Sequence, residues 1–175
     1  MKITEFVAPV SKFRSGRGAE ESVTEARIVR SGEGEQYGTM YHFKQGSLTG
    51  GRFDFMVGEM RYLSGPPLHV HRDQDDTFYV LDGAITLQIR DEIVELKAGD
   101  FATVPPGTPH TFDNFRKDQP AKVVNVMTPG GLDALFQDME MLAAAMRDPK
   151  RADELWEKHG VRVVGPPLKD KLGLA

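Results

Sequence analysis

The chain contains no cysteine among its 175 residues. This absence excludes disulfide bonds and thiolate metal sites, so any bound metal ion must be held by nitrogen and oxygen ligands. A strong positive charge is also missing, because the net charge is −4 at pH 7 and acidic and basic residues are intermixed. Without a basic stripe along any segment, nucleic acid is not an expected partner.

Long apolar runs are missing too. No stretch approaches the length that a membrane-spanning helix needs, and the first residues lack the apolar core of a signal peptide. We therefore expect a cytoplasmic protein that has no membrane partner. The length suits one domain with a sizeable core.

Glycine and proline are plentiful, at 18 and 11 residues, and they separate short apolar runs. This placement of glycine and proline is typical of many short strands joined by turns. The runs that we expect to form strands are 37–43, 53–63, 78–81, 84–89, 92–96, 101–104 and 121–127. Several of them are connected as hairpins at even spacing, which favours an antiparallel all-β protein.

The apolar period changes after the last of these strands. Apolar residues in 132–146 recur at intervals of three and four, which predicts a helix. Asp148 and Pro149 predict a second helix, with Asp148 as its N-cap, and His159 is expected to cap its C-terminal end. The remaining tail, 161–175, is predicted to be extended. We thus expect one domain overall, composed of an N-terminal extension (1–35), a β-barrel (36–130) and C-terminal helices with a tail (131–175).

Candidate chemistry is concentrated in two stretches. His69 and His71 are two residues apart, so on a strand both would point to one face, as two ligands of one metal ion would. Asp76 follows at the start of an apolar run, and His110 comes after a Pro/Gly turn. By contrast, His42 stands alone on a strand and is expected to be a packed or surface residue.

These two stretches resemble the paired motifs of the cupin superfamily. The first motif reads G-x5-H-x-H-x4-E-x6-G, and this chain matches it from His69 through Asp76 to Gly83. Two departures are visible: Gly65 lies closer to His69 than the motif has it, and Asp76 stands where the family has glutamate.

The second motif reads G-x5-P-x-G-x2-H-x3-N. Its five positions are filled without exception, by Gly99, Pro105, Gly107, His110 and Asn114. The resemblance implies a double-stranded β-helix, also called a jelly-roll barrel, which carries the helices as a C-terminal appendage.

The resemblance also implies a metal site. His69, His71 and His110, with Asp76 in the acidic position, would bind one divalent transition metal ion. Such nitrogen and oxygen ligands suit Fe, Mn, Ni, Cu, Co or Zn without choosing among them. Because aspartate is one methylene shorter than glutamate, Asp76 could ligate from a bulged strand, bind through water or act as an outer-sphere base. A three-histidine site, or a barrel that holds no metal, also stays open.

Counting by twos from the ligands identifies candidate pocket residues. Phe78 shares a strand face with Asp76, and Phe112 and Asn114 share one with His110. The two phenylalanines are candidate walls for a planar substrate, although ordinary barrel core explains each of them equally well.

Three stretches, 65–83, 129–132 and 161–168, resemble single-domain cupins grouped with quercetin 2,3-dioxygenases. This resemblance implies a metal-dependent dioxygenase that acts with O2 on a flavonol or another small enolisable aromatic. Asp76, in the position of the family's glutamate, would be the catalytic base that takes the enol proton. Two alternatives remain: a non-oxidative isomerase or decarboxylase that uses the metal as a Lewis acid, and a binding protein without turnover.

A homodimer is the expected assembly. The apolar segment 6–10 and the Met/Leu face of 132–146 exceed what a small closed barrel needs to cover itself. Exposed apolar patches usually mark interfaces, and two-fold dimers are the commonest oligomers.

Overall fold

The computed structural model describes residues 28–37, 41–43, 49–145 and 149–174. The apolar segment 6–10, most of the predicted N-terminal extension and the predicted cap Asp148 lie outside these residues, as does the side chain of His42. No helix in the described ranges is long and apolar enough to cross a membrane.

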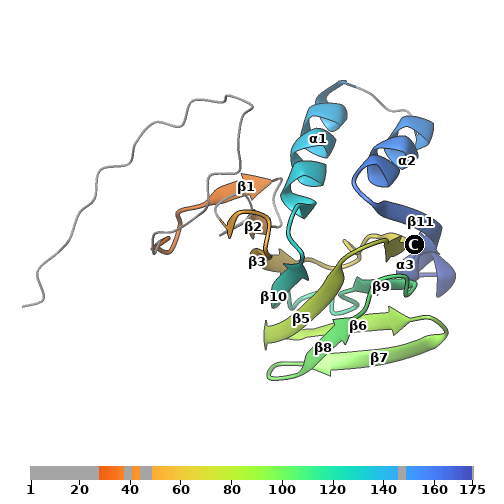
Figure 1. The fold of residues 1–175 in the computed structure, drawn as a ribbon. Helices are drawn as coiled ribbons and strands as arrows, with labels where there is room; N and C mark the ends of the chain where they lie inside the picture. Colours follow the sequence, from red (N-terminus) through yellow and green to blue (C-terminus); the bar gives the residue numbers. More distant parts are fainter. Residues whose placement is uncertain (1–27, 38–40, 44–48, 146–148, 175) are drawn as a thin grey trace, which may run out of the picture.

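Two antiparallel sheets face each other and form the barrel (Figure 1). In spatial order, the first sheet contains β1 (Glu35–Tyr37), β2 (Tyr41–Phe43), β3 (Asp54–Met60), β10 (Ala121–Thr128), β5 (Asp75–Asp82) and β8 (Phe101–Val104). The second sheet contains β11 (Val161–Pro167), β4 (Pro67–His71), β9 (His110–Asp113), β6 (Ala84–Ile89) and β7 (Glu92–Lys97). Strands that follow each other in sequence often lie in opposite sheets, as in a jelly roll.

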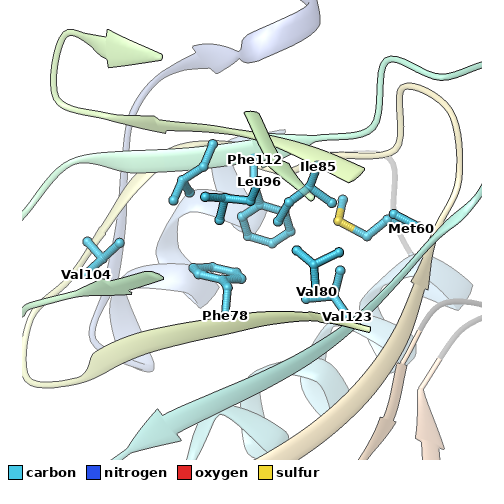
Figure 2. Close-up of a cluster of buried hydrophobic side chains, with 10 residues drawn as sticks. Met60, Phe78, Val80, Ile85, Leu96, Val104, Phe112 and Val123 are labelled. Atoms are coloured by element: carbon cyan, nitrogen blue, oxygen red, sulfur yellow. The ribbon is translucent and has the colours of Figure 1, made fainter. Parts of the chain in front are cut away.

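Alternating burial shows which side chains fill the barrel. On β10, for example, residues 121, 123, 125 and 127 are buried and the residues between them are more exposed. A strand with this alternation places every second residue inside. Figure 2 shows the resulting core at one end of the barrel, where Phe78, Val80, Ile85 and Phe112 pack among other apolar side chains.

Two helices cover the other end of the barrel. α1 (Leu132–Ala145) and α2 (Pro149–Lys158) stand on the side opposite the β6–β7 hairpin (Figure 1). Their apolar residues pack with barrel residues in a second cluster, which we call the helical cover. Its members are Met56, Met127, Leu132, Leu135 and Val161, with Tyr37, Phe136, Met139, Leu155 and Trp156 packed against them. Both helices were expected from the sequence, and both are confirmed.

Asp54 fixes the start of α1. Its Oδ2 accepts hydrogen bonds from the backbone N–H groups of Gly131 (2.8 Å) and Leu132 (2.7 Å), which have no partner within the helix. The side chain is fully buried, and burial raises the pKa of this carboxyl although the two backbone hydrogen bonds act against the shift. One buried residue of β3 therefore connects the barrel to its cover.

The tail contributes a strand that the sequence did not place in the barrel. β11 pairs antiparallel with β4, so that Val161 lies opposite His71 and Val163 opposite His69. The short helix α3 (Leu168–Lys171) follows. The predicted extended conformation is confirmed up to Pro167, and this extended segment belongs to the sheet.

His159 lies directly after α2, where it was predicted to cap the helix, and its side chain also has a partner on α1. Its Nε2 lies 2.7 Å from Oδ2 of Asp138 on α1, and Lys158 Nζ lies 2.8 Å from the same oxygen. His159 therefore binds α2 to α1 through a side-chain pair, because the two helices lie close enough for that carboxylate to reach the end of α2.

Candidate metal centre

Three histidines meet on two neighbouring strands. His69 and His71 lie on β4 and His110 lies on β9, directly opposite His69 in the antiparallel register. The ring centroids are 4.5 Å apart for His69 and His110, 5.0 Å for His69 and His71, and 5.4 Å for His71 and His110. The i and i+2 spacing thus places both β4 imidazoles inside the barrel, as predicted.

Asp76 approaches the histidines from the opposite sheet. Its Oδ2 on β5 lies 3.1 Å from Nε2 of His110 and 3.6 Å from Nε2 of His71. One nitrogen or oxygen from each of the four residues lies within 4.8 Å of the others. Ligand atoms about 2.1 Å from a metal ion lie roughly 3 to 4 Å from one another, so this group could hold one ion.

Backbone carbonyls determine the tautomers of two imidazoles. Nδ1–H of His69 donates to the carbonyl of Pro67 (2.8 Å), and Nδ1–H of His110 donates to the carbonyl of Thr108 (2.9 Å). This assignment rests on the hydrogen-bond pattern and leaves Nε2 of each ring unprotonated in the neutral form. An unprotonated Nε2 is the form of the ring that can bind a metal ion.

The contact between His110 and Asp76 needs a positive charge. With Nδ1–H donated to Thr108, neutral His110 presents a lone pair to a carboxylate oxygen only 3.1 Å away. Two acceptors at this distance repel unless a proton or a cation lies between or beside them. Without a metal ion, a proton on Nε2 makes His110 an imidazolium that donates to Asp76. A divalent cation could take the place of this proton, so the donor set fits such an ion.

Burial prepares these groups for metal binding. His69, His71, Asp76 and His110 are exposed by 4, 3, 3 and 1 %. Burial, with the charges of the two neighbouring imidazoles, lowers the pKa of His69 to about 3, and burial also lowers that of His71. For Asp76, burial acts to raise the pKa, but the hydrogen bond and charge of His110 outweigh it and hold the pKa below its usual range. At neutral pH the β4 pair is neutral and Asp76 is ionised, which are the ligating forms.

Asn125 orients the carboxylate and was missed by the sequence analysis. Its amide on β10 donates to Oδ1 of Asp76 and to the carbonyl of Thr77 (3.0 Å). Oδ2 is thereby left facing the histidines. The available signal was a lone amide on the buried face of a Val/Met-rich strand, where a polar side chain needs a partner.

The glycine at position 65 has a local explanation. A Cβ at this position would lie 1.9 Å from the carbonyl oxygen of Phe112, so only glycine allows the chain to pass this close to β9. The N–H of Gly65 also donates to Oδ1 of Asp113 (2.9 Å). This contact holds the segment that leads into β4 against the strand that carries His110.

The three predicted pocket residues have partners in the barrel core and in a loop. The rings of Phe78 and Phe112 meet edge to face, with centroids 4.8 Å apart, inside the core cluster of Figure 2. Asn114 donates to the carbonyls of Met60 (2.9 Å) and Gln119 (2.8 Å), and its oxygen accepts from the N–H of Arg116. The amide of Asn114 thus has no free hydrogen for a substrate, and it stabilises the loop before β10.

Comparison with known proteins gives a consistent picture of the fold. Residues 57–127 match the family model described as the cupin domain. The crystal structure of a predicted oxalate decarboxylase from Thermotoga maritima superposes with a TM-score of 0.52 at 20% identity, covering 59% of this chain and 99% of that one. At this identity the likeness shows the fold alone, and the predicted all-β jelly roll with C-terminal helices is confirmed.

Two curated relatives are similar in sequence. Quercetin 2,3-dioxygenase of Bacillus subtilis (strain 168) is 36% identical over 89 residues, which are 49% of this chain and 26% of the enzyme. The probable oxidoreductase virH of Hypocrea virens is 35% identical over 95 residues, 52% of this chain and 43% of that protein. The chain therefore spans less than half the length of each relative.

Proposed function

Because the chain belongs to the cupin superfamily, we propose that His69, His71, Asp76 and His110 bind one divalent transition metal ion and that the protein is a metal-dependent dioxygenase. The observation that carries the proposal is the buried group of three imidazoles and one carboxylate, whose ligand atoms lie within 4.8 Å of one another and in which His110 Nε2 and Asp76 Oδ2 are 3.1 Å apart. The ion is Fe, Mn, Ni, Cu, Co or Zn, since imidazole and carboxylate ligands accept all six.

The proposed substrate is a flavonol or another small enolisable aromatic, and O2 is the second reactant. Similarity to the quercetin 2,3-dioxygenase of Bacillus subtilis supports this choice. When bound, the metal ion would supply Lewis acidity and, for every candidate except Zn, the redox chemistry that allows O2 to react with the enolate and cleave a ring carbon–carbon bond.

Asp76 is the proposed general base. Its ionised Oδ2 would accept the proton of the enol hydroxyl, directly or through one water molecule. The hydrogen bond from Asn125 to Oδ1 prevents the carboxylate from turning away, so the same oxygen keeps facing the histidines. The carbonyls of Pro67 and Thr108 hold two of the imidazole rings in place. Burial of all four side chains excludes bulk water from the site.

Metal analysis and O2 consumption test the proposal together. Protein purified without added metal should contain about one transition metal ion per chain and should consume O2 with quercetin. His110→Ala should lose most of the metal while remaining folded, whereas His159→Ala, which removes an imidazole outside the cluster, should keep it. Full metal occupancy in His110→Ala would refute the site. A metal-loaded protein that consumes no O2 but converts or merely binds a small molecule would instead indicate the isomerase, decarboxylase or binding alternative.

A further inference from the structure

The indole of Trp156 lies against a proposed metal ligand. Its ring centroid is 5.9 Å from that of His69, and the two ring planes make an angle of 56°. Trp156 is the only tryptophan of the chain, and it is located on α2 of the helical cover. A residue from outside the cupin motifs therefore borders the candidate metal centre.

The four candidate ligands are closed off from solvent, each being exposed by 4% or less. A small molecule must therefore pass other side chains to reach an open coordination position. At one end, the close-packed core of Figure 2 fills the barrel between two hydrogen-bonded sheets. At the other end, the barrel is closed by the helical cover, whose two helices are not part of either sheet (Figure 1).

Trp156 combines partial exposure with a ring contact to a candidate ligand. Its side chain is partly exposed, whereas Val161, which belongs to the same cluster and is paired with His71, is fully buried. Tryptophan offers a large rigid apolar face, which suits contact with a planar aromatic molecule.

We infer that Trp156 is the ligand-contacting residue of this site and that its indole stacks on an aromatic ligand bound beside His69. The inference rests on the proposed metal site, but it does not require that the ligand be a flavonol or that it be turned over. It adds a specificity-determining residue on α2 to the ligands that the two motifs supply.

The test uses 4-nitrocatechol, a coloured chelating aromatic, with metal-loaded protein in the absence of O2. Binding should quench the emission of Trp156 in the unaltered protein, because the only tryptophan would lie against the bound ring. Trp156→Ala should weaken 4-nitrocatechol affinity by about tenfold, whereas Trp156→Phe should stay within about threefold of the parent because it retains an aromatic face. Metal content should be unchanged in both variants.

Leu155→Ala is the matched control, since Leu155 is the neighbouring residue and packs in the same cluster without a ring contact to His69. The Leu155→Ala protein should lose packing contacts in the helical cover but bind 4-nitrocatechol as tightly as the parent. Unchanged affinity in Trp156→Ala, equal weakening in Leu155→Ala, or failure of the metal-loaded parent to bind the probe would each overturn the inference. If Trp156→Ala does not fold, the quenching in the parent protein and the affinity of Trp156→Phe for 4-nitrocatechol still test the inference. Absence of O2 consumption with quercetin would refute the dioxygenase proposal while leaving these binding results intact.

Discussion

Asp76 reaches the histidines despite its short side chain. Oδ2 is 3.1 Å from His110 Nε2 and 3.6 Å from His71 Nε2, and Asn125 holds the other oxygen. A glutamate is therefore not needed to bring a carboxylate into this cluster. Of the roles considered from the sequence, direct ligation and action as a base both remain compatible with these distances.

Replacing Asp76 by Asn keeps the side-chain volume but removes the negative charge and the proton acceptor. We expect the metal affinity of Asp76→Asn to fall roughly 10- to 100-fold, and the rate with quercetin to fall about a hundredfold or more. Metal titration and an oxygen electrode measure the two effects. Asp73→Asn removes an exposed carboxylate from the same turn and should behave like the parent. If Asp76→Asn matched the parent in metal content and rate, the site would be a three-histidine site without this base.

At the scale of elements, the junction between β3 and α1 depends on one buried acid. Asp54 accepts two N–H groups at the start of α1, while its other oxygen has no hydrogen-bond partner among the described residues. This imbalance accounts for a carboxyl whose pKa is raised by burial. The carboxyl of Asp54 therefore stabilises the start of α1, but its ionisation inside the protein costs free energy.

The raised pKa of Asp54 predicts a pH dependence. From about 3.8, its ordinary value, up to its raised value, the folded protein holds the proton that the unfolded chain has released. The free energy of unfolding contributed by this group must therefore decrease as pH rises through that window, and it stays low above it. Urea unfolding at several pH values should show a flatter profile for Asp54→Asn than for the parent. Asp54→Ala, which loses both hydrogen bonds, should be less stable by about 1–2 kcal/mol. An unchanged profile in Asp54→Asn would contradict this assignment.

Local sequence predicted the elements whose boundaries are set by turn residues. The strands 84–89 and 101–104 have the predicted boundaries. Gly83 precedes the first strand and Arg90–Asp91 follow it, while Gly99 and Asp100 precede the second. β11 was not assigned to a sheet because its partner, β4, is far away in sequence and nothing in the segment 161–167 specifies that pairing. The motif spacings indicated the four candidate ligands. Asn125 and Trp156 were not indicated, because their positions depend on register and on helix packing.

At the scale of the whole molecule, the structure changes the argument for a homodimer. The apolar residues Leu132 and Leu135 of α1 are buried against the barrel, so they do not support an interface. Phe101 of β8 and Tyr79 of β5 are instead candidates for an interface, because they are paired with each other and are exposed by 62 and 42%. β8 is the edge strand of its sheet in the described part of the chain.

A homodimer remains our prediction, with this edge as the contact between two copies. Light scattering at micromolar concentration should give twice the mass of the chain, and Phe101→Glu should shift the protein to the monomer because it places a charge in the apolar contact. Leu172→Glu, at an exposed leucine elsewhere, should leave the dimer intact. A monomeric parent protein would contradict the prediction.

The pairing of β11 with β4 has a consequence for biosynthesis. β4 carries two of the three imidazoles, and it obtains its neighbour on one side only when the segment 161–167 has left the ribosome. Chains fold from the N-terminus as they are made, and pairings between distant segments form late. A nascent chain that has already exposed both histidine motifs thus still lacks the strand and the helices that enclose them. We therefore expect the four ligands to be most open to a metal ion before β11 and the two helices have packed onto the barrel.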